Sequence, residues 1–237
     1  MKAICKRMYQ TTSLFGLALL LLTISPATQA DDNLYTIHYQ TQGPGHLHSL
    51  QPHPEPALFS GKHPDTDNIR MLEDGYDLMG FSGFEAGDIP PAQALAHGRS
   101  IQADTILVYV RKVTGKGQPQ SRKNNDANTP VYRYYATFWA RLPAPLLGVH
   151  AIKLVTRDAA RQDEPATSTA GVRIIAVIHG SLAERNGILR NDQLLSINRE
   201  KVESAATLSS LISKYKGNTV TLQLERAGKP LSIQLSL

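Results

Sequence analysis

The chain has 237 residues, of which 25 are Lys or Arg and 20 are Asp or Glu, so its formal net charge at pH 7 is +5. Without Lys2, Lys6 and Arg7, at the extreme N-terminus, the charge falls to +2. A chain so weakly charged gives no reason to expect a nucleic-acid partner. The single cysteine, Cys5, lies in the same segment, so the rest of the chain has no disulfide, thiol nucleophile or cysteine metal ligand.

Residues 1–30 are predicted to be a secretory signal peptide. A basic start precedes the apolar run LFGLALLLLTI at 14–24, and small residues follow Pro26. The apolar run is shorter than the roughly twenty residues that cross a bilayer. We therefore expect cleavage after Ala30, Sec-type export to a bacterial periplasm or beyond, and no stable membrane span in the exported chain.

Residues 31–70 are predicted to be an irregular lead-in, because GPGHLHSLQPHPEP at 43–56 has neither a helical nor a strand period. Four histidines lie in this region: His46, His48, His53 and His63. Imidazoles in an extended chain can chelate a transition metal. Solvated linker histidines are the commoner situation, so we expect no metal site and no cofactor.

Residues 71–142 are predicted to form a small α+β domain with the order strand, helix, strand, strand. The strand-like MLEDGYDLMGFSGF precedes PPAQALAHGRSIQ, whose prolines suit a helix start. TILVYV at 105–110 has the pattern of a buried strand, and residues 131–142 alternate as in a half-buried strand. The aromatic residues of this last strand, Trp139 among them, are expected in a core rather than on a sugar- or base-binding surface.

Residues 145–237 follow the proline-bounded joint LPAP. They contain, in order, GVRIIAVI, GSLAERNGI, DQLLSIN, the amphipathic helix candidate SAATLSSLISKY, TVTLQLER and PLSIQLSL. This order resembles a PDZ domain of the bacterial HtrA-protease-associated type, which implies a partly open β-barrel or sandwich with a helix that lines a groove. The segments MLEDGYDLMGFSGF and DTILVYV resemble an uncharacterised bacterial secreted domain often placed ahead of PDZ modules.

The chain departs from the family pattern at three positions. Leu182 replaces Pro, while Asn191 and Arg199 stand where Gly is usual. Asn tolerates the left-handed backbone region, so the second departure is mild. Arg199 is expected to weaken its turn.

Ser181, two residues after His179, raises the possibility of a hydrolase nucleophile. The lipase-type motif Gly-x-Ser-x-Gly is absent, because position 183 is Ala. We instead expect Ser181 to cap a short helix and Gly187 to end it with a positive φ.

PDZ domains bind a peptide, usually a free C-terminus, as an extra strand. By resemblance, the carboxylate-binding loop is Leu146-Leu147-Gly148-Val149, whose backbone N–H groups would bind the carboxylate. The pairing edge would be formed by Val149, His150, Ala151 and Ile152. Pocket candidates on the helix are Leu208, Leu211 and Ile212, with a core position favoured for Leu211.

The sequence thus predicts a periplasmic or secreted, non-enzymatic peptide-binding or adaptor protein without catalytic residues. Its partner would be a protein C-terminus or an extended segment. Two alternatives stay open. One is a hydrolase activity in residues 71–142 with the PDZ domain as substrate tether, and the other is a secretion-machinery component that retains its N-terminal anchor.

Overall fold

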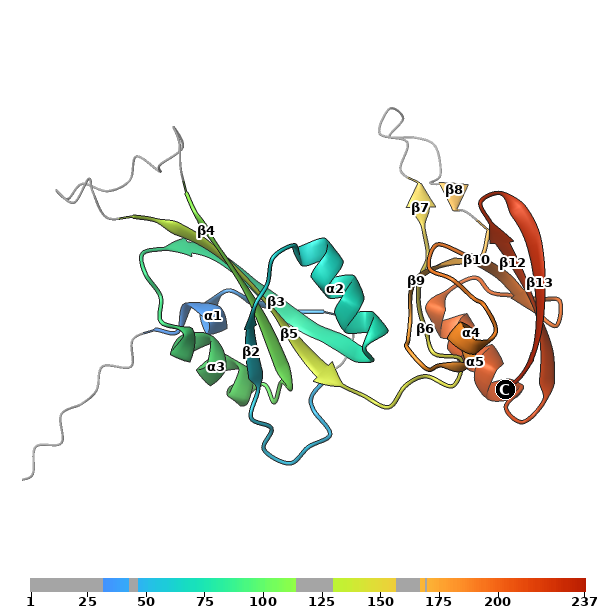
Figure 1. Cartoon of the computed structure of the whole chain (residues 1–237), viewed down its shortest axis with the longest axis horizontal. Helices are drawn as coiled ribbons and strands as arrows, with labels where there is room; N and C mark the ends of the chain where they lie inside the picture. Colours follow the sequence, from blue (N-terminus) through green and yellow to red (C-terminus); the bar gives the residue numbers. More distant parts are fainter. Residues whose placement is uncertain (1–31, 43–46, 114–129, 157–166, 169) are drawn as a thin grey trace, which may run out of the picture. The chain divides into compact units, whose positions relative to one another are not determined.

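A computed structural model describes residues 32–42, 47–113, 130–156, 167–168 and 170–237 (Figure 1). The predicted signal peptide and His46 lie outside the described residues. In the part of the chain that is described, no helix has the length and apolar composition to cross a bilayer.

The first unit is an α+β domain built on a five-stranded sheet (Figure 1). In spatial order its strands are β1 (Tyr39–Thr41), β3 (Tyr76–Ala86), β5 (Tyr132–Arg141), β4 (Thr105–Lys112) and β2 (Ala57–Ser60). The pair β2 and β4 is parallel, and the other three pairs are antiparallel. Its helices are α1 (Leu34–Ile37), α2 (Pro64–Glu73) and α3 (Pro91–Ser100).

The predicted order strand, helix, strand, strand is confirmed by β3, α3, β4 and β5. The prediction of an irregular lead-in at 31–70 is wrong, because this region contains α1, β1, β2 and α2. Strands β1 and β2 are short edge strands that add to a sheet formed by later residues, so they carry too few residues to show a period of their own. The α+β domain therefore includes these residues and does not begin at Met71.

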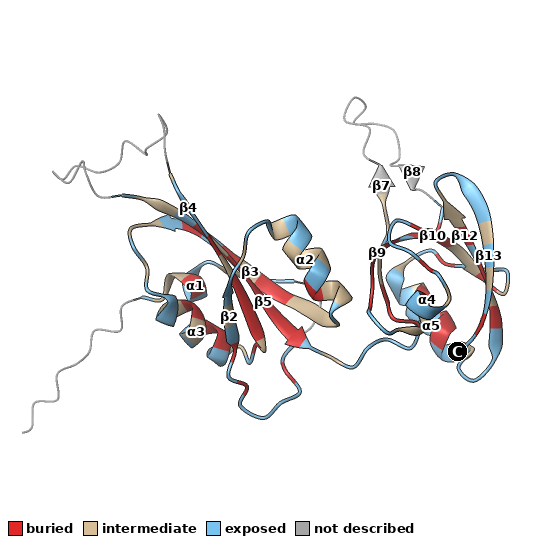
Figure 2. Cartoon of the chain, viewed as in Figure 1, coloured by how far each residue is buried: buried red, intermediate tan, exposed pale blue. Residues whose placement is uncertain are grey.

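The core of this domain lies along its central strands (Figure 2). Phe138 and Ala140 of β5 are fully buried with Ile106 of β4. Trp139 is 1% exposed, and its indole N–H donates to the Thr137 hydroxyl at 2.9 Å. The expected core position of Trp139 is confirmed, and its polar atom is satisfied internally.

Residues 145–237 form a second unit around an open six-stranded sheet. Its strands are β6 (Val149–Ile152), β9 (Val172–Val177), β10 (Gln193–Ile197), β11 (Glu200–Lys201), β12 (Thr219–Arg226) and β13 (Lys229–Ser236). The spatial order is β13-β12-β10-β9-β6, with β11 paired to β10. A separate ribbon joins β7 (Val155–Thr156) to β8 (Thr167–Ser168), and the helices are α4 (Leu182–Arg185) and α5 (Ala205–Lys214).

The predicted turn and cap residues of this unit are confirmed. The Ser181 hydroxyl accepts the N–H of Glu184 at 3.2 Å, which caps α4. Gly187 has φ +74° and Asn191 has φ +74°, as the turn signals required. Arg199 has φ +70°, a left-handed conformation that is unfavourable for a side chain of its type.

A bidentate ion pair joins the turn before β10 to the end of β12. The carboxylate of Asp192, which is 1% exposed, accepts hydrogen bonds from Arg226 at 2.6 and 2.7 Å. It also accepts the N–H of Leu189 at 2.8 Å. This pairing satisfies an otherwise buried charge and holds the turn in place.

Candidate functional site

Strand β6 lies at one edge of the second sheet and, among the described strands, pairs only with β9. Val149 lies opposite Val177, and the next residue, Ile178, donates its N–H to the Gly148 carbonyl oxygen at 2.9 Å. In an antiparallel pair, residues flanked by such bonds form a non-hydrogen-bonded pair, whose own backbone groups point away from the partner strand. The N–H and C=O of Val149 therefore face the unpaired edge.

Ala151 presents a second set of backbone groups at the same edge. It lies opposite Ile174, whose N–H donates to the Asp192 carbonyl oxygen and whose C=O accepts the N–H of Asn191. Because Ile174 uses both groups on the side of β10, the groups of Ala151 point away from β9. A guest strand can therefore hydrogen-bond to β6 at Val149 and Ala151.

The loop that leads into β6 directs its carbonyl groups inward. The carbonyl oxygen of Leu147 accepts the N–H of Ala183 at 2.9 Å, and that of Gly148 accepts the N–H of Ile178 at 2.9 Å. In the described residues, no backbone or side-chain group accepts the N–H of Leu147 or Gly148. Together with the N–H of Val149, these amides are three successive donors without an acceptor among the described residues, and successive backbone N–H groups can bind an anion.

The loop requires glycine at position 148 for two reasons. Gly148 has φ +79°, which side chains rarely adopt. A Cβ atom there would also lie 2.2 Å from the Cβ of Ser181. The backbone of the loop therefore packs directly against the turn that begins α4.

A groove of about 480 Å³ lies between β6 and α5. It is lined by Pro145, Leu146, Leu147, Val149, His150, Ala151, Ala205, Leu208, Ser209, Ile212, Ser213 and Lys216. The apolar side chains of Leu208 and Ile212, each 7% exposed, form its floor on the helix side. An aliphatic or aromatic side chain of a guest peptide can be buried there.

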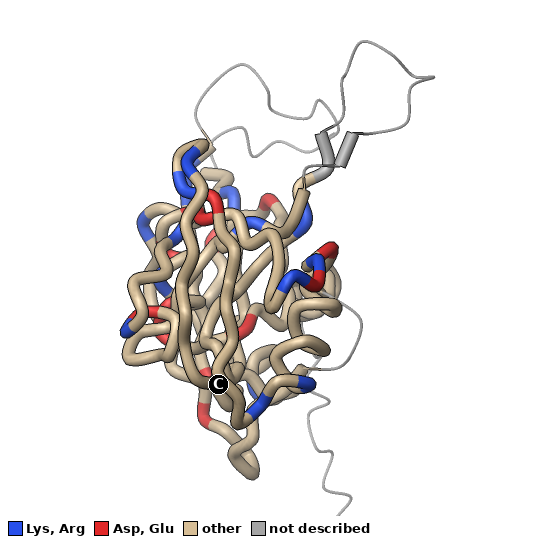
Figure 3. Tube along the Cα trace, turned by 90° about the vertical axis from the view of Figure 1, so that its right-hand side faces the viewer, with Lys and Arg blue, Asp and Glu red and all other residues tan. Residues whose placement is uncertain are grey.

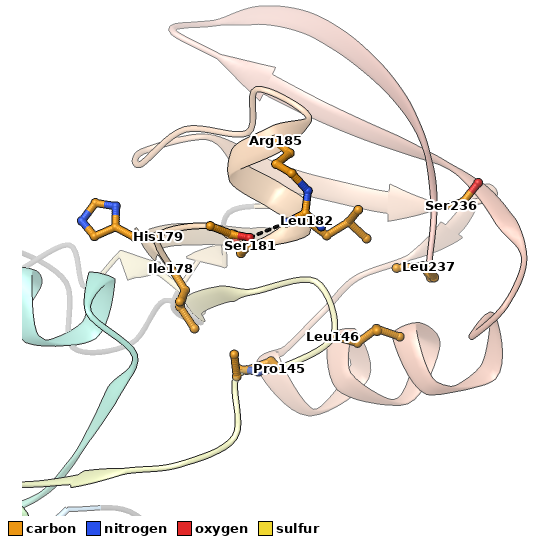
Figure 4. Close-up of a pocket in the computed structure, with 11 residues that line it drawn as sticks. Pro145, Leu146, Ile178, His179, Ser181, Leu182, Arg185, Ser236 and Leu237 are labelled. Carbon is orange, nitrogen blue, oxygen red and sulfur yellow. Dashed lines mark hydrogen bonds between the residues drawn. The ribbon is translucent and has the colours of Figure 1, made fainter.

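Contacts beyond the ends of α5 show which end of the helix lies near each end of β6. After the helix, the N–H of Gly217 donates to the carbonyl oxygen of Leu237 at 2.9 Å, and Leu237 lines a cavity together with Leu146 (Figure 4). Before the helix, Glu203 lines another cavity together with Lys153, which follows β6. The C-terminal end of α5 therefore lies beside the loop, and its N-terminal end lies beside the far end of β6.

The structure brings together seven of the ten predicted binding residues along the groove. The other three do not line it. Gly148 lies in the loop with its backbone against the turn before α4, Leu211 is 7% exposed and belongs to the core of the domain, and Ile152 is 42% exposed outside the groove. Contact of the seven with a peptide stays a prediction.

Sequence reasoning missed several groove residues on the helix. Ala205, Ser209 and Ser213 follow each other at intervals of four residues, in the row next to Leu208 and Ile212. Helical spacing around the two apolar residues could have identified this row. Lys216, beyond the end of α5, carried no such signal.

A second cavity of about 470 Å³ lies on the other side of Leu146, around the turn before α4 (Figure 4). The Glu184 carboxylate accepts the N–H of Gly180 at 2.6 Å, and this bond holds the pKa of Glu184 below its usual value. Glu184 also lies 3.2 Å from Nδ1 of His179, and this hydrogen bond raises the pKa of His179. Arg185 donates to the carbonyl oxygen of Gly180.

These bonds hold the turn against which the loop packs. The hydroxyl of Ser181 accepts the Glu184 N–H, while the ring of His179 points away from Leu146 in Figure 4. Among the described residues, no hydrogen bond joins His179 to Ser181. Within the same ranges, no three His, Cys, Asp or Glu side chains gather closely enough to hold a metal ion.

Comparison with known proteins finds a PDZ domain. No curated protein matches the chain. Among solved structures, the HtrA3 PDZ domain bound to the phage-derived ligand FGRWV is 20% identical, covers 38% of this chain and 81% of its own, and has a TM-score of 0.31. The HtrA-type protease AlgW with a decapeptide is 22% identical over 37% of this chain and 27% of its own, with a TM-score of 0.31.

The PDZ domain of EpsC from Vibrio cholerae is 14% identical over 40% of this chain and all of its own, with a TM-score of 0.28. A family model described as PDZ domain matches residues 145–237. Residues 145–237 therefore belong to the PDZ domain family.

Proposed function

We propose that this protein is a non-enzymatic peptide-binding or adaptor protein, whose PDZ domain binds the C-terminus or an extended segment of a partner by strand addition. The observation that carries the proposal is the continuity of three features. The amides of Leu147 and Gly148, which have no acceptor in the described ranges, lead directly into β6, whose outer edge is unpaired in those same ranges, and the groove beside α5 lies along that edge. A terminal carboxylate, a peptide backbone and an apolar side chain each have a complementary partner there.

The magnitudes support a weak, reversible interaction. One buried aliphatic side chain contributes roughly 1.5–3 kcal/mol, and each hydrogen bond contributes about 1 kcal/mol. Association opposes these gains by about 4 kcal/mol or more. Micromolar dissociation constants are therefore expected for a single peptide.

The protein is further proposed to act in a bacterial periplasm or outside the cell. The basic, apolar and small-residue segments of residues 1–30 support this location, since this order is typical of a Sec-type signal peptide. N-terminal sequencing of the protein recovered from the periplasm should find residue 31 or a near neighbour first. An intact N-terminus would instead support a retained anchor.

The binding proposal is tested with the full exported chain and a library of decapeptides with free C-termini, with binding measured by fluorescence polarisation. Ser209 and Ser210 are neighbouring exposed residues of α5, but only Ser209 lines the groove. Ser209→Trp should fill the groove and weaken the best peptide by more than about tenfold, since the apolar anchor loses its place. Ser210→Trp, with the same change in helix composition, should bind as the unmodified protein does.

Amidation of the peptide C-terminus provides an independent measurement. Loss of the carboxylate should weaken binding by roughly tenfold, as expected for a charge-assisted hydrogen bond. Equal affinity of both Trp variants, together with no effect of amidation, would refute the proposed groove.

A further inference from the structure

A large cavity of about 790 Å³ lies beyond the end of the groove that is remote from the loop. Its lining comprises Lys153, Ala170, Gly171, Leu195, Ser196, Arg199, Lys201, Val202 and Glu203. Three of these side chains are basic and one is acidic. We refer to this cavity as the basic cavity.

Both walls of the groove continue into the basic cavity. On the strand side, Ala151 lines the groove and Lys153, two residues later, lines the cavity. On the helix side, Ala205 lines the groove and Glu203, two residues earlier, lines the cavity. A chain that leaves the groove at this end therefore enters the basic cavity.

The direction of a bound peptide follows from the position of the loop. A carboxylate at Leu147 and Gly148 places the C-terminus of the peptide at the beginning of β6, so the peptide runs antiparallel to β6. Strand β6 has four residues, Val149–Ile152. At about 3.3 Å per residue, the last four peptide residues extend along β6. The residues before them reach the basic cavity.

The charges of Arg199 and Lys201 are not neutralised by Glu200, the acid that lies between them in the sequence. Glu200 accepts hydrogen bonds from Lys214, at 2.7 and 2.8 Å, and from the hydroxyl of Tyr215. In the described part of the chain, Arg199 and Lys201 form no ion pair. Acidic and basic residues are both spread over the face shown in Figure 3, so this cluster is a local feature.

Arg199 stands in a conformation that favours glycine. Its φ of +70° lies in the left-handed region, which is unfavourable for residues other than glycine. A strained residue that persists at the mouth of a cavity is expected to have a role there.

We propose that the basic cavity binds acidic side chains located about four to seven residues before the C-terminus of the bound peptide. The inference rests on the proposed strand addition and specifies the partner: a protein whose apolar C-terminus is preceded by an acidic segment. Arg199 and Lys201 are the residues that select the acidic segment.

The test uses three peptides that share the four C-terminal residues of the best decapeptide binder. The six preceding residues are all Ser, or contain four Asp, or contain four Lys. At low salt, the Asp peptide should bind the full chain roughly threefold to tenfold more tightly than the Ser peptide, as expected for two or three exposed ion pairs. The Lys peptide should bind most weakly, and rising salt should bring the three affinities together.

The variant Arg199→Asn, Lys201→Gln should abolish the preference for the Asp peptide and leave the affinity for the Ser peptide unchanged. Arg190→Asn, Lys229→Gln is the matched control, because it removes the same charges from exposed residues that line neither the groove nor the cavity. Equal binding of all three peptides by the unmodified protein would overturn this inference alone. No binding of any peptide would overturn the proposed function as well.

Discussion

Among the described residues, the backbone amides beside the edge strands β2 and β6 differ in whether the chain itself supplies an acceptor. After β2, the N–H groups of Lys62 and His63 donate to the carboxylate of Asp67 at 2.8 and 3.0 Å. Before β6, the N–H groups of Leu147 and Gly148 have no acceptor among the described residues. The first domain supplies its own carboxylate, whereas in the PDZ domain we propose that the carboxylate of a bound peptide takes this place.

The edge strands β2 and β6 also differ in how far their side chains are buried. Both β2 and β6 have four residues, but three of the four residues of β2 are exposed, including Phe59 at 55%. On β6, Val149 is 8% exposed and forms one wall of a groove whose other wall is α5. A free edge alone offers only backbone hydrogen bonds, and the groove adds the apolar burial that makes binding favourable.

The largest expected effect comes from adding a side chain at Gly148, in the loop whose amides have no acceptor among the described residues. Gly148→Ala places a Cβ atom 2.2 Å from the Cβ of Ser181, so it should displace the loop. We expect a loss of more than about tenfold in peptide affinity and about 2 kcal/mol in the free energy of unfolding. Gly180→Ala is the control, because Gly180 also has a positive φ but its Cβ would meet no atom within 4 Å. An equal effect of both variants on affinity would contradict the role of the loop.

The internal carboxylate gives the complementary experiment. Asp67→Ala removes the acceptor of two amides before α2, so the α+β domain should lose about 1 kcal/mol of stability in urea denaturation. Peptide affinity should not change. A change in affinity would show that the two amide groups do not act independently.

A smaller effect, an increase rather than a decrease in the free energy of unfolding, is expected from a substitution at Arg199. Arg199→Gly should raise the free energy of unfolding of the PDZ domain by about 0.5–1 kcal/mol, because glycine adopts a φ of +70° without strain. It should also weaken the binding of the Asp peptide but not that of the Ser peptide. Thermal denaturation and fluorescence polarisation measure the two effects, and a decrease in stability would contradict the assigned strain.

The smallest effect concerns the turn behind the loop. The pKa of His179, measured by NMR titration, should lie above its ordinary value of 6.5 and return towards it in Glu184→Gln. Because the pKa is raised on folding, the contribution of His179 to stability is complete below pH 6.5 and is lost as the pH rises through its folded-state pKa. Glu184 has a lowered pKa, so its contribution is present above pH 4.5 and is lost as the pH falls. An unshifted His179 would contradict this hydrogen bond.

Strongly periodic segments and turn residues could be predicted from the sequence, and features created by neighbouring elements could not. The order of β3, α3, β4 and β5 and the cap at Ser181 followed from local pattern. Strands β1 and β2 were missed because their partners lie far along the chain. The basic cavity was missed for the same reason, since Lys153 and Arg199 come together only through folding.

Amide hydrogen exchange of the full chain, followed by NMR with and without the best decapeptide, tests the central contrast most directly. We expect the amides of Leu147 and Gly148 to exchange rapidly in the free protein and to become protected when the peptide binds, while those of Lys62 and His63 exchange slowly in both states. Slow exchange at Leu147 and Gly148 without peptide, or no change when the peptide binds, would contradict the account.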